Sequence, residues 1–341
     1  MERTPTDRDP QIEIRELTDD SIKFSLSNTD TSVANALRRV MVAEVKTMAI
    51  DRVEVFKNSS VLTDEFIAHR LGLIPLNYNY NDQNLNYCQG SAADMLGTLE
   101  HRFMDPTECD CDDRCFKCCV TFDLKVQFAF DEDPNIVTKL VTSKDLKLLP
   151  IADDGLLIAD VQPVHFSNQE ERRDAHDDGI LIVKLARGQE VDMQCVALLG
   201  IAKQHAKWSP VSSCAFACEA VVTPNMAAFN RLSPEQKAAL LELCREPIFE
   251  VHDSGSIYAE NSKDWLFTGE LEDKCREIMG CFNHNLVSIK REESKFIFSV
   301  ETTGALAPED VVQQALHVIK TKMEYIQEEI RRESERMASF V

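Results

Sequence analysis

The sequence predicts an α+β protein. Segments in which apolar residues strictly alternate recur along the chain, which is typical of half-buried strands. One apolar stripe with helical spacing follows the first of these segments, and a second, longer stripe closes the chain. Strands and helices therefore both contribute, in separate runs and without the regular alternation of a βαβ protein.

The first strands and the first helix form one predicted group. Residues 11–27 read as a β-hairpin with one buried face, because isoleucine, phenylalanine and leucine alternate on either side of a turn at 18–20. A helix from Thr31 to about Ala43 follows, capped by Asp30 or Thr31, and would cover that face. Its apolar stripe consists of Val33, Leu37, Val40 and Met41.

The next segments predict a strand, a short helix and another strand. Residues 49–56 alternate as a strand, and the helix after them starts at Thr63 as cap and stops at Gly72 and Pro75. Residues 77–107 predict an irregular excursion with one short helix at about 92–99. Residues 120–130 alternate so strictly that all their even-numbered apolar side chains, including Phe130, should share one face of a strand.

The second half of the chain predicts more strands and a change of character. Residues 180–202 indicate a hairpin that turns at Arg187-Gly188, and 214–222 a strand with Cys214 and Cys218 as core thiols. Residues 224–284 contain two expected helices and suggest a separate small module. A strand at 294–300 and a long helix from Pro308 to about Met337 end the chain.

Composition excludes several classes of protein. With 341 residues and 44% hydrophobic content, the chain can bury more than one core. Its formal net charge of −21 opposes binding to phosphate backbones, so a free-standing nucleic-acid binder is not expected. The amino terminus lacks the apolar run of a secretory signal, and no stretch is long and apolar enough for a membrane helix, so an intracellular, soluble protein is expected.

Four cysteines predict a metal site. Cys109, Cys111, Cys115 and Cys118 have the spacing Cys-x-Cys-x3-Cys-x2-Cys, which brings four thiolates within reach of one tetrahedral Zn²⁺. Four sulfurs close the coordination shell, so one structural zinc is expected and a catalytic one is not. Free buried thiols and an iron–sulfur group are the alternatives; the polar residues between the cysteines disfavour the first. Cys119 is left out of the ligand set because side chains alternate along a strand.

No other residue type indicates a reaction. Cys88, Cys244, Cys275 and Cys281 read as core thiols, and the histidines, His69 and His205 among them, show no paired metal-ligand spacing. The sequence contains no nucleophile motif, phosphate-binding glycine loop or dinucleotide fingerprint. No catalytic residue is therefore predicted.

The last helix carries a continuous apolar seam. Its residues recur at intervals of four and three: Val312, Leu316, Ile319, Met323, Ile326 and Ile330. A helix of about 28 residues is roughly 42 Å long, which exceeds what a modest domain covers by itself. The seam either packs wholly inside this chain or serves, with the Leu37 face of the first helix, as an interface to another subunit.

Three strings identify a family resemblance. NTDTSVANALRRVMVAEVKTMAIDRVEV (28–55), DEFIAHRLGLIPL (64–76) and GIAKQHAKWSPV (200–211) resemble the alpha-like subunits of cellular RNA polymerases. With the cysteine loop and the string VETTGALAPEDVV at the last helix, the chain is most similar to the third-largest-subunit branch of eukaryotic RNA polymerase II. The alpha-like branch of polymerases I and III has related Asn-Ala-Leu-Arg-Arg and His-Arg-Leu-Gly strings but, in that family, not this cysteine loop, so the loop favours the polymerase II branch.

The resemblance implies a domain organisation and a role. It implies a discontinuous dimerisation domain (1–55 plus 285–341), an inserted, mainly-β domain with the zinc loop (56–223) and a small accessory α/β module (224–284). It implies a nuclear, non-catalytic scaffold subunit. Its expected partners are a smaller alpha-like subunit, the two large catalytic subunits and small zinc-binding subunits, with DNA contacted only through the complex. The implied dimer interface contains Val33, Leu37, Arg38, Val40, Met41, Val312, Leu316, Ile319, Met323 and Ile326.

The sequence leaves some features and functions undecided. Certain archaeal relatives bind an iron–sulfur cluster in the region equivalent to 224–284, but this chain lacks the cysteine run that such a cluster needs, so none is expected. Arg38 and Arg39 favour an intersubunit ion pair or backbone contact over a phosphate contact. An alpha-like subunit of polymerases I and III, a redox protein or metalloenzyme, and a zinc-loop DNA binder are the alternative functions.

Overall fold

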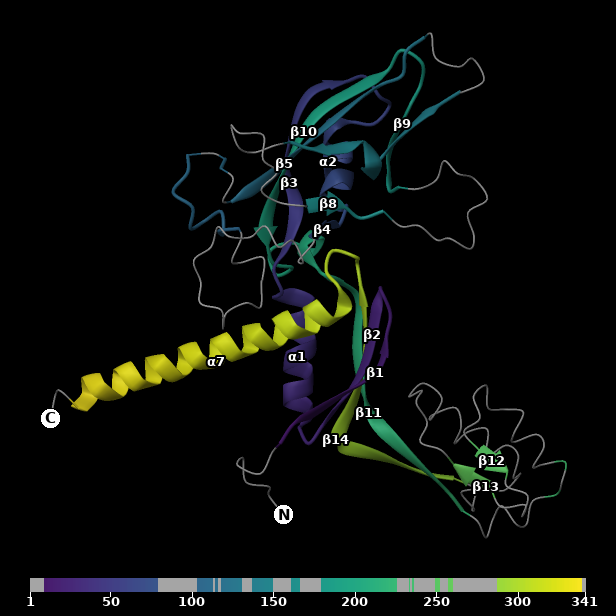
Figure 1. Cartoon of the computed structure of the whole chain (residues 1–341), viewed down its shortest axis with the longest axis vertical. Helices are drawn as coiled ribbons and strands as arrows, with labels where there is room; N and C mark the ends of the chain where they lie inside the picture. The colour runs from purple at the N-terminus through teal and green to yellow at the C-terminus, as the bar shows by residue number, and fades with distance from the viewer. Residues whose placement is uncertain are drawn as a thin grey trace. The chain divides into compact units, whose positions relative to one another are not determined.

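The computed structural model confirms the α+β class, with strands that pair antiparallel (Figure 1). The structure describes residues 9–78, 103–112, 114–115, 118–130, 137–149, 161–165, 179–225, 233, 235, 249–251, 257–259 and 287–338. The chain divides into two units. Unit 1 contains residues 1–17, 22–38 and 214–300, and unit 2 contains 18–21, 39–213 and 301–341.

Unit 1 is built on a four-stranded sheet with the order β1-β2-β14-β11. Its strands are β1 (Gln11–Leu17), β2 (Ser21–Ser27), β14 (Val287–Thr302) and β11 (Val211–Pro224). The predicted hairpin is confirmed, since β1 pairs antiparallel with β2 and the Thr18 N–H donates to the Ser21 carbonyl (2.9 Å). A pair of short strands, β12 (Phe249–Val251) and β13 (Ile257–Ala259), forms a separate ribbon.

Aromatic side chains from three strands form the core of unit 1. The rings of Phe24 and Phe298 stack with centroids 4.7 Å apart, and Phe216 meets Phe298 at 5.3 Å. Phe24 and Phe298 are fully buried. Packing of this kind adds to the free energy gained by burying the aromatic surface, so these strands are held together by side chains as well as by backbone hydrogen bonds.

A bulge in β1 re-aims one charged side chain. The register of β1 and β2 shifts between Ile14 and Glu16, which leaves Arg15 as the extra residue. Arg15 forms an ion pair with Glu219 (2.5 Å), and Lys295 approaches the same carboxylate at 2.8 Å. The Glu219 side chain is only 6% exposed, so this three-residue group is a largely buried charge network that joins β1, β11 and β14.

The two predicted terminal helices are confirmed. Asp30 directly precedes helix α1 (Thr31–Ala43) and caps it, because its Oδ1 accepts the Val33 N–H (3.1 Å). Helix α7 (Pro308–Ala338) has 31 residues and begins with Glu309 and Asp310, which the helix dipole favours. Among the helices of the described residues, none is both long and apolar enough to cross a membrane.

Unit 2 is built on a second sheet, with the order β3-β10-β5-β7. Its strands are β3 (Thr47–Asn58), β10 (Glu190–Gly200), β5 (Cys119–Gln127) and β7 (Leu146–Leu148). Helix α2 (Asp64–Gly72) contributes Ile67 and Leu71 to the core on one face of this sheet. Two short pairs complete the unit: β4 (Leu76–Tyr78) with β8 (Val161–Pro163), and β6 (Lys139–Thr142) with β9 (Leu181–Leu185). Two 3-10 turns are η2 (Ser143–Asp145) and η3 (Ala206–Trp208).

The predicted hairpin at 180–202 is wrong as a pairing. Strands β9 and β10 do follow one another through a turn in which Gly188 has φ +80°, but they belong to different sheets. A strand has two edges, and β10 uses one for β3 and the other for β5. Strand β9 therefore pairs with β6 instead.

Two smaller expectations also need correction. Thr63 precedes α2, but its side chain makes no capping hydrogen bond, and acidic residues in the first turn stabilise the helix start instead. Phe130 does not join the buried face of β5, because the strand ends at Gln127; its ring lies over Gly188, where an added Cβ would approach it within 2.5 Å. The helices expected at about 92–99 and within 224–284 lie outside the described residues.

The charge network of Glu219 yields a stability prediction. Burial raises the pKa of Glu219, but hydrogen bonds and charge from Lys295 and Arg15 outweigh it and hold this pKa below its ordinary value. We expect Glu219→Gln to lower the free energy of unfolding by about 2 kcal/mol at pH 7. Because the folded-state pKa is depressed, this contribution is complete above the unfolded pKa of about 4.3 and is lost as pH falls through the folded value.

Denaturant titrations of both proteins at pH 7 and at about pH 3 measure this difference. The exposed Glu293→Gln in β14 is the matched control and should change the free energy of unfolding by less than about 0.5 kcal/mol. A Glu219→Gln penalty that is equally large at both pH values would contradict the assignment.

Candidate metal centre

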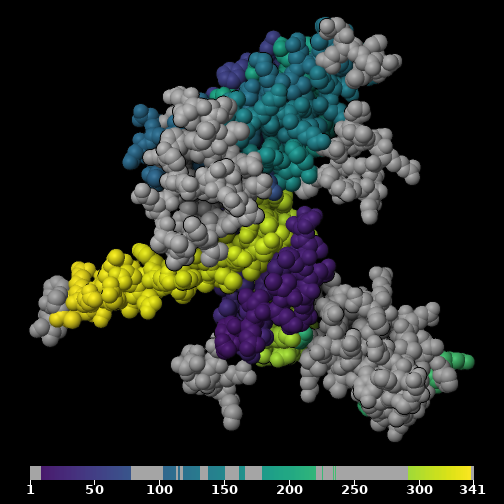
Figure 2. Space-filling view, in the orientation of Figure 1, coloured from purple at the N-terminus to yellow at the C-terminus, as the bar shows by residue number. Residues whose placement is uncertain are grey.

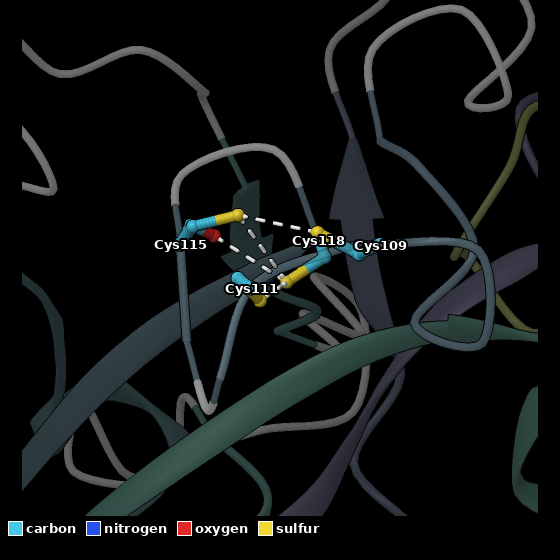
Figure 3. A group of neighbouring side chains, drawn as sticks. All are labelled: Cys109, Cys111, Cys115 and Cys118. Carbon is cyan, nitrogen blue, oxygen red and sulfur yellow. Dashed lines mark hydrogen bonds between the residues drawn. The ribbon is translucent and has the colours of Figure 1, made fainter.

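Four cysteine sulfurs turn toward one another in the loop before β5 (Figure 3). The Sγ atoms of Cys109 and Cys115 are 3.5 Å apart, and Cys118 Sγ lies 3.6 Å from both Cys111 and Cys115. All four sulfurs lie within 4.8 Å of one another. The structure therefore brings together the complete set that the spacing predicts.

These separations fit one tetrahedral ion. Four sulfurs at about 2.3 Å from a central Zn²⁺ are about 3.8 Å apart, which is close to the distances found here. A disulfide needs a sulfur–sulfur distance of about 2.0 Å, and none of these four cysteines forms one. The donor set suits Zn²⁺, and it would leave no coordination position for a substrate or an activated water.

The protonation of the four sulfurs bears on how an ion would bind them. Burial raises the pKa of Cys118, and the pKa of Cys111 is raised first by its hydrogen bond to Cys109. Crowded thiols therefore resist ionisation when no cation is bound. A dication supplies the missing positive charge and converts them to thiolates, so metal binding and thiol deprotonation are coupled.

Two turns shape the loop. The Asp105 carboxylate accepts the Thr107 N–H (3.0 Å) and hydroxyl (2.6 Å), which forms a tight turn just before the first cysteine. The Thr107 hydroxyl, ahead of the opposing effect of burial, holds the pKa of Asp105 below its ordinary value. In the second turn, the N–H groups of Cys118 and Cys119 both donate to the Cys115 carbonyl (3.2 Å each). The sulfurs are thus positioned by backbone that is already ordered.

The loop packs on the second face of the sheet in unit 2. Residues Met193, Cys195 and Ala197 of β10 belong to the main core on the first face. Because side chains alternate along a strand, Val196 and Leu198 lie on the other face, and there they pack against the cysteine group. Val196 is fully buried in consequence. The cysteine loop is the layer that covers this face.

Arg114 ties the same loop to two strands. Its guanidinium forms an ion pair with Glu54 of β3 (2.8 Å) and donates to the Gln194 side chain of β10 (2.9 Å). Glu54 and Gln194 are direct neighbours in the register of these strands. Sequence reasoning missed this role, although an arginine inside an acidic cysteine loop was a visible indication.

The other described cysteines do not join the group. Cys119 starts β5, and its Sγ–H donates to the Cys115 carbonyl (3.4 Å) outside the set of four. Cys195 lies in the core, where burial raises its pKa to about 12. Cys214 and Cys218 of β11 are half-buried. Cys88, Cys244, Cys275 and Cys281 lie outside the described residues.

The residues predicted for a subunit interface separate into two sets. Leu37, Val40, Met41 and Val312 are buried by this chain alone, and Arg38 donates to the Asn35 side chain within α1 (3.1 Å). Ile319 is half-buried. The exposed members, with their exposed fractions, are Val33 (44%), Leu316 (40%), Met323 (58%) and Ile326 (49%).

The C-terminal part of α7 therefore carries an exposed apolar stripe, which we call the outer stripe. It consists of Leu316, Met323, Ile326, Ile330 and Met337. The buried residues of this helix all lie between Pro308 and Ala315, in its first eight positions. Figure 2 shows the side chains of the remaining part (yellow) at the molecular surface.

The comparisons with known proteins identify the family to which this chain belongs. A family model described as the RNA polymerase Rpb3/Rpb11 dimerisation domain matches residues 23–323. The chain belongs to this family, whose match includes α1 and the first half of α7, as far as residue 323. The resemblance noted in the sequence is thereby confirmed.

Individual relatives indicate which kind of RNA polymerase subunit this chain resembles. DNA-directed RNA polymerase II subunit rpb3 of Dictyostelium discoideum is 36% identical over 94% of both chains. DNA-directed RNA polymerases II, IV and V subunit 3 of Arabidopsis thaliana is 38% identical over 96% of this chain and 93% of its own. The polymerase I and III subunit rpac1 of Dictyostelium discoideum is 31% identical over 91% and 78%. The protein is accordingly an Rpb3-like, alpha-like RNA polymerase subunit.

The metal site yields a direct prediction. Cys115→Ser should release the ion and lower the melting temperature, because the sheet face of Val196 loses a fixed cover. Metal content by mass spectrometry and amide exchange of residues 119–127 measure the two effects, and exchange should rise in the variant.

Cys119→Ser is the matched control, since Cys119 is adjacent, buried and outside the set of four. It should keep one ion per chain. Full metal content in Cys115→Ser, or complete loss in Cys119→Ser, would refute the proposed ligand set.

Proposed function

We propose that this chain is a non-catalytic assembly subunit of RNA polymerase II, which pairs with a smaller alpha-like subunit and then supports docking of the two large catalytic subunits. The observation that carries the proposal is the outer stripe of α7, together with membership of a family whose description names a dimerisation domain. In this proposal residues 1–55 plus 285–341 form the pairing domain, 56–223 the inserted domain and 224–284 an accessory module.

The stripe has the properties of a helix-pairing surface. Its residues are seven, three, four and seven positions apart, and the half-buried Ile319 divides the first interval into three and four. This is the spacing that lets two helices interlock along a seam. The part of α7 after Ala315 has 23 residues and is about 34 Å long, so it can carry a substantial share of a stable interface. Exposed methionine and isoleucine along such a length are unfavourable in water and favour a permanent partner.

The burial of each residue decides whether it can contact the partner in this proposal. Leu37, Val40, Met41 and Val312 contribute by fixing the fold of the chain, because they are inaccessible. Contact with the partner falls to Leu316, Met323 and Ile326, and to Val33 of α1 as a separate exposed position.

Polymerase II is the preferred complex and the nucleus the proposed location. Two relatives that serve polymerase II are 36% and 38% identical to this chain, against 31% for one relative of polymerases I and III, and these two are matched over more of their own length. An alpha-like subunit of polymerases I and III is the second candidate, supported by the same family match.

The cysteine group supports one structural Zn²⁺ in this proposal. Its four sulfurs would close the coordination shell, which disfavours the alternative of a metalloenzyme. The loop would stiffen the sheet of unit 2 and present a surface to the large subunits or to the small zinc-binding subunits. The net charge of −21 favours DNA contact only through the complex and disfavours a zinc-loop DNA binder.

Ile326→Glu tests the pairing. A charge placed in the centre of the seam should weaken binding of the smaller alpha-like subunit at least about thirtyfold, the loss of a well-buried anchor, while zinc content and the melting temperature of the chain stay unchanged. Binding is measured by titration of the purified chain with that subunit.

Thr321→Glu is the control, because it adds the same charge to the same helix at an exposed position away from the stripe. It should bind as the unaltered chain does. Equal affinity of Ile326→Glu and the unaltered chain would rule out this face of α7 as the interface.

A further inference from the structure

The string 200–211, which helps to identify the family, forms a rigidly held loop in unit 2. Gly200 lies against the Trp208 ring, where an added Cβ would come within 2.5 Å of ring atoms. The Trp208 indole N–H donates to the Leu198 carbonyl (3.1 Å), and the Thr47 hydroxyl donates to the Trp208 carbonyl (2.8 Å). Lys207 lies over the same ring and pairs with Asp51 (2.5 Å). These contacts fix both ends of the loop on the sheet.

The middle of this loop reaches the end of helix α1. The Lys203 N–H donates to the Ala43 carbonyl (3.1 Å), and its ammonium group forms an ion pair with Glu44 (2.5 Å). Lys322 of α7 forms a second ion pair with the same carboxylate. Glu44 therefore joins three segments of unit 2: the end of α1, the 201–204 turn and α7.

The position of Glu44 explains why its carboxylate needs positively charged partners. Glu44 follows the C-terminal residue of α1, where the negative end of the helix dipole disfavours a carboxylate, and α1 has no basic residue in its last turn. The two lysines supply the missing positive charge from other segments. Burial raises the pKa of Glu44, but hydrogen bonds from Lys203 and Lys322 outweigh it and keep this pKa below its ordinary value. The Glu44 side chain is 14% exposed, so the junction is partly shielded from solvent.

The junction lies just beyond the part of α7 that contains its buried residues. The helix is buried as far as Ala315, and Lys322 is seven positions, or about 10 Å, further along. Beyond Lys322 the apolar residues of the stripe are 49% to 71% exposed. A 34 Å helix segment held only at its base moves at its tip by about 6 Å for a tilt of 10°. A second fixed point at Lys322 restricts that tilt.

We infer that Glu44 is a positioning residue for subunit pairing: its carboxylate links Lys322 of α7 to Lys203 of the 201–204 turn, and it thereby sets the direction in which α7 presents its outer stripe to the smaller alpha-like subunit. The inference rests on the proposed function. Glu44 need not touch the partner itself. Its effect on pairing passes through Lys322 and the base of the helix.

Glu44→Gln is the test, made in the full-length chain. Amide exchange of residues 316–323 should become severalfold faster, and affinity for the smaller alpha-like subunit should fall about fivefold, the effect of a partly exposed ion pair. Glu324→Gln is the matched control: it removes an acid of α7 that pairs only loosely with Lys320 (3.8 Å), and both quantities should stay unchanged. If Glu44→Gln folds poorly, Lys203→Gln replaces it as the test. This variant removes only the side-chain contact from the loop and should show the same two changes to a smaller extent.

A double-mutant cycle separates positioning from direct contact. If Glu44 acts through Lys322, Glu44→Gln and Lys322→Gln together should weaken pairing no more than the stronger of the two alone. Additive losses, or unchanged exchange of 316–323 in Glu44→Gln, would overturn the inference. Failure of the unaltered chain to bind the smaller subunit would instead refute the proposed function, while the exchange measurement would still decide whether Glu44 holds α7.

Discussion

Strand β10 carries apolar side chains on both of its faces, and the organisation of unit 2 follows from the need to cover both. The first face is covered by the main core, to which Ile67 and Leu71 of α2 contribute. The second face is covered by the cysteine loop, which encloses Val196. A loop of about ten polar and sulfur-bearing residues has too little apolar surface to hold this position alone, so a bound ion would supply much of the free energy that keeps it there.

Helix α7 shows the opposite arrangement, because most of its apolar surface has no cover within the described part of the chain. Its first eight residues are anchored, and the remaining 23 present the outer stripe. A stripe of this length can be recognised only if its direction is defined. In the proposed account, the junction of Glu44, Lys203 and Lys322 fixes that direction, and it belongs to the same unit as the cysteine loop. In this account, the fixed position of the base of α7 determines how the outer stripe is presented to the partner subunit.

Local patterns in the sequence were sufficient to predict most elements of the described fold. Alternation predicted β1, β2 and β5, helical spacing predicted α1 and α7, and cysteine spacing predicted the group of four. The partner of β9 was not predictable, because strand pairing depends on which edges of β10 are already taken. The sequence also left open whether Leu37 and Val312 pack inside this chain or against a second subunit, since a helical stripe looks the same in both cases; the structure buries both residues in this chain. Arg114 and Glu44 act through contacts distant in sequence, which no local pattern contains.

Native mass spectrometry of the chain, coexpressed with a smaller alpha-like polymerase subunit, tests the central claim most directly. The account predicts a single dominant species that contains one copy of each subunit and one zinc ion. It also predicts that the two subunits stay together on dilution to protein concentrations at which a weak complex would be fully dissociated. A stable monomer or a homodimer of this chain, unaffected by the smaller subunit, would contradict it.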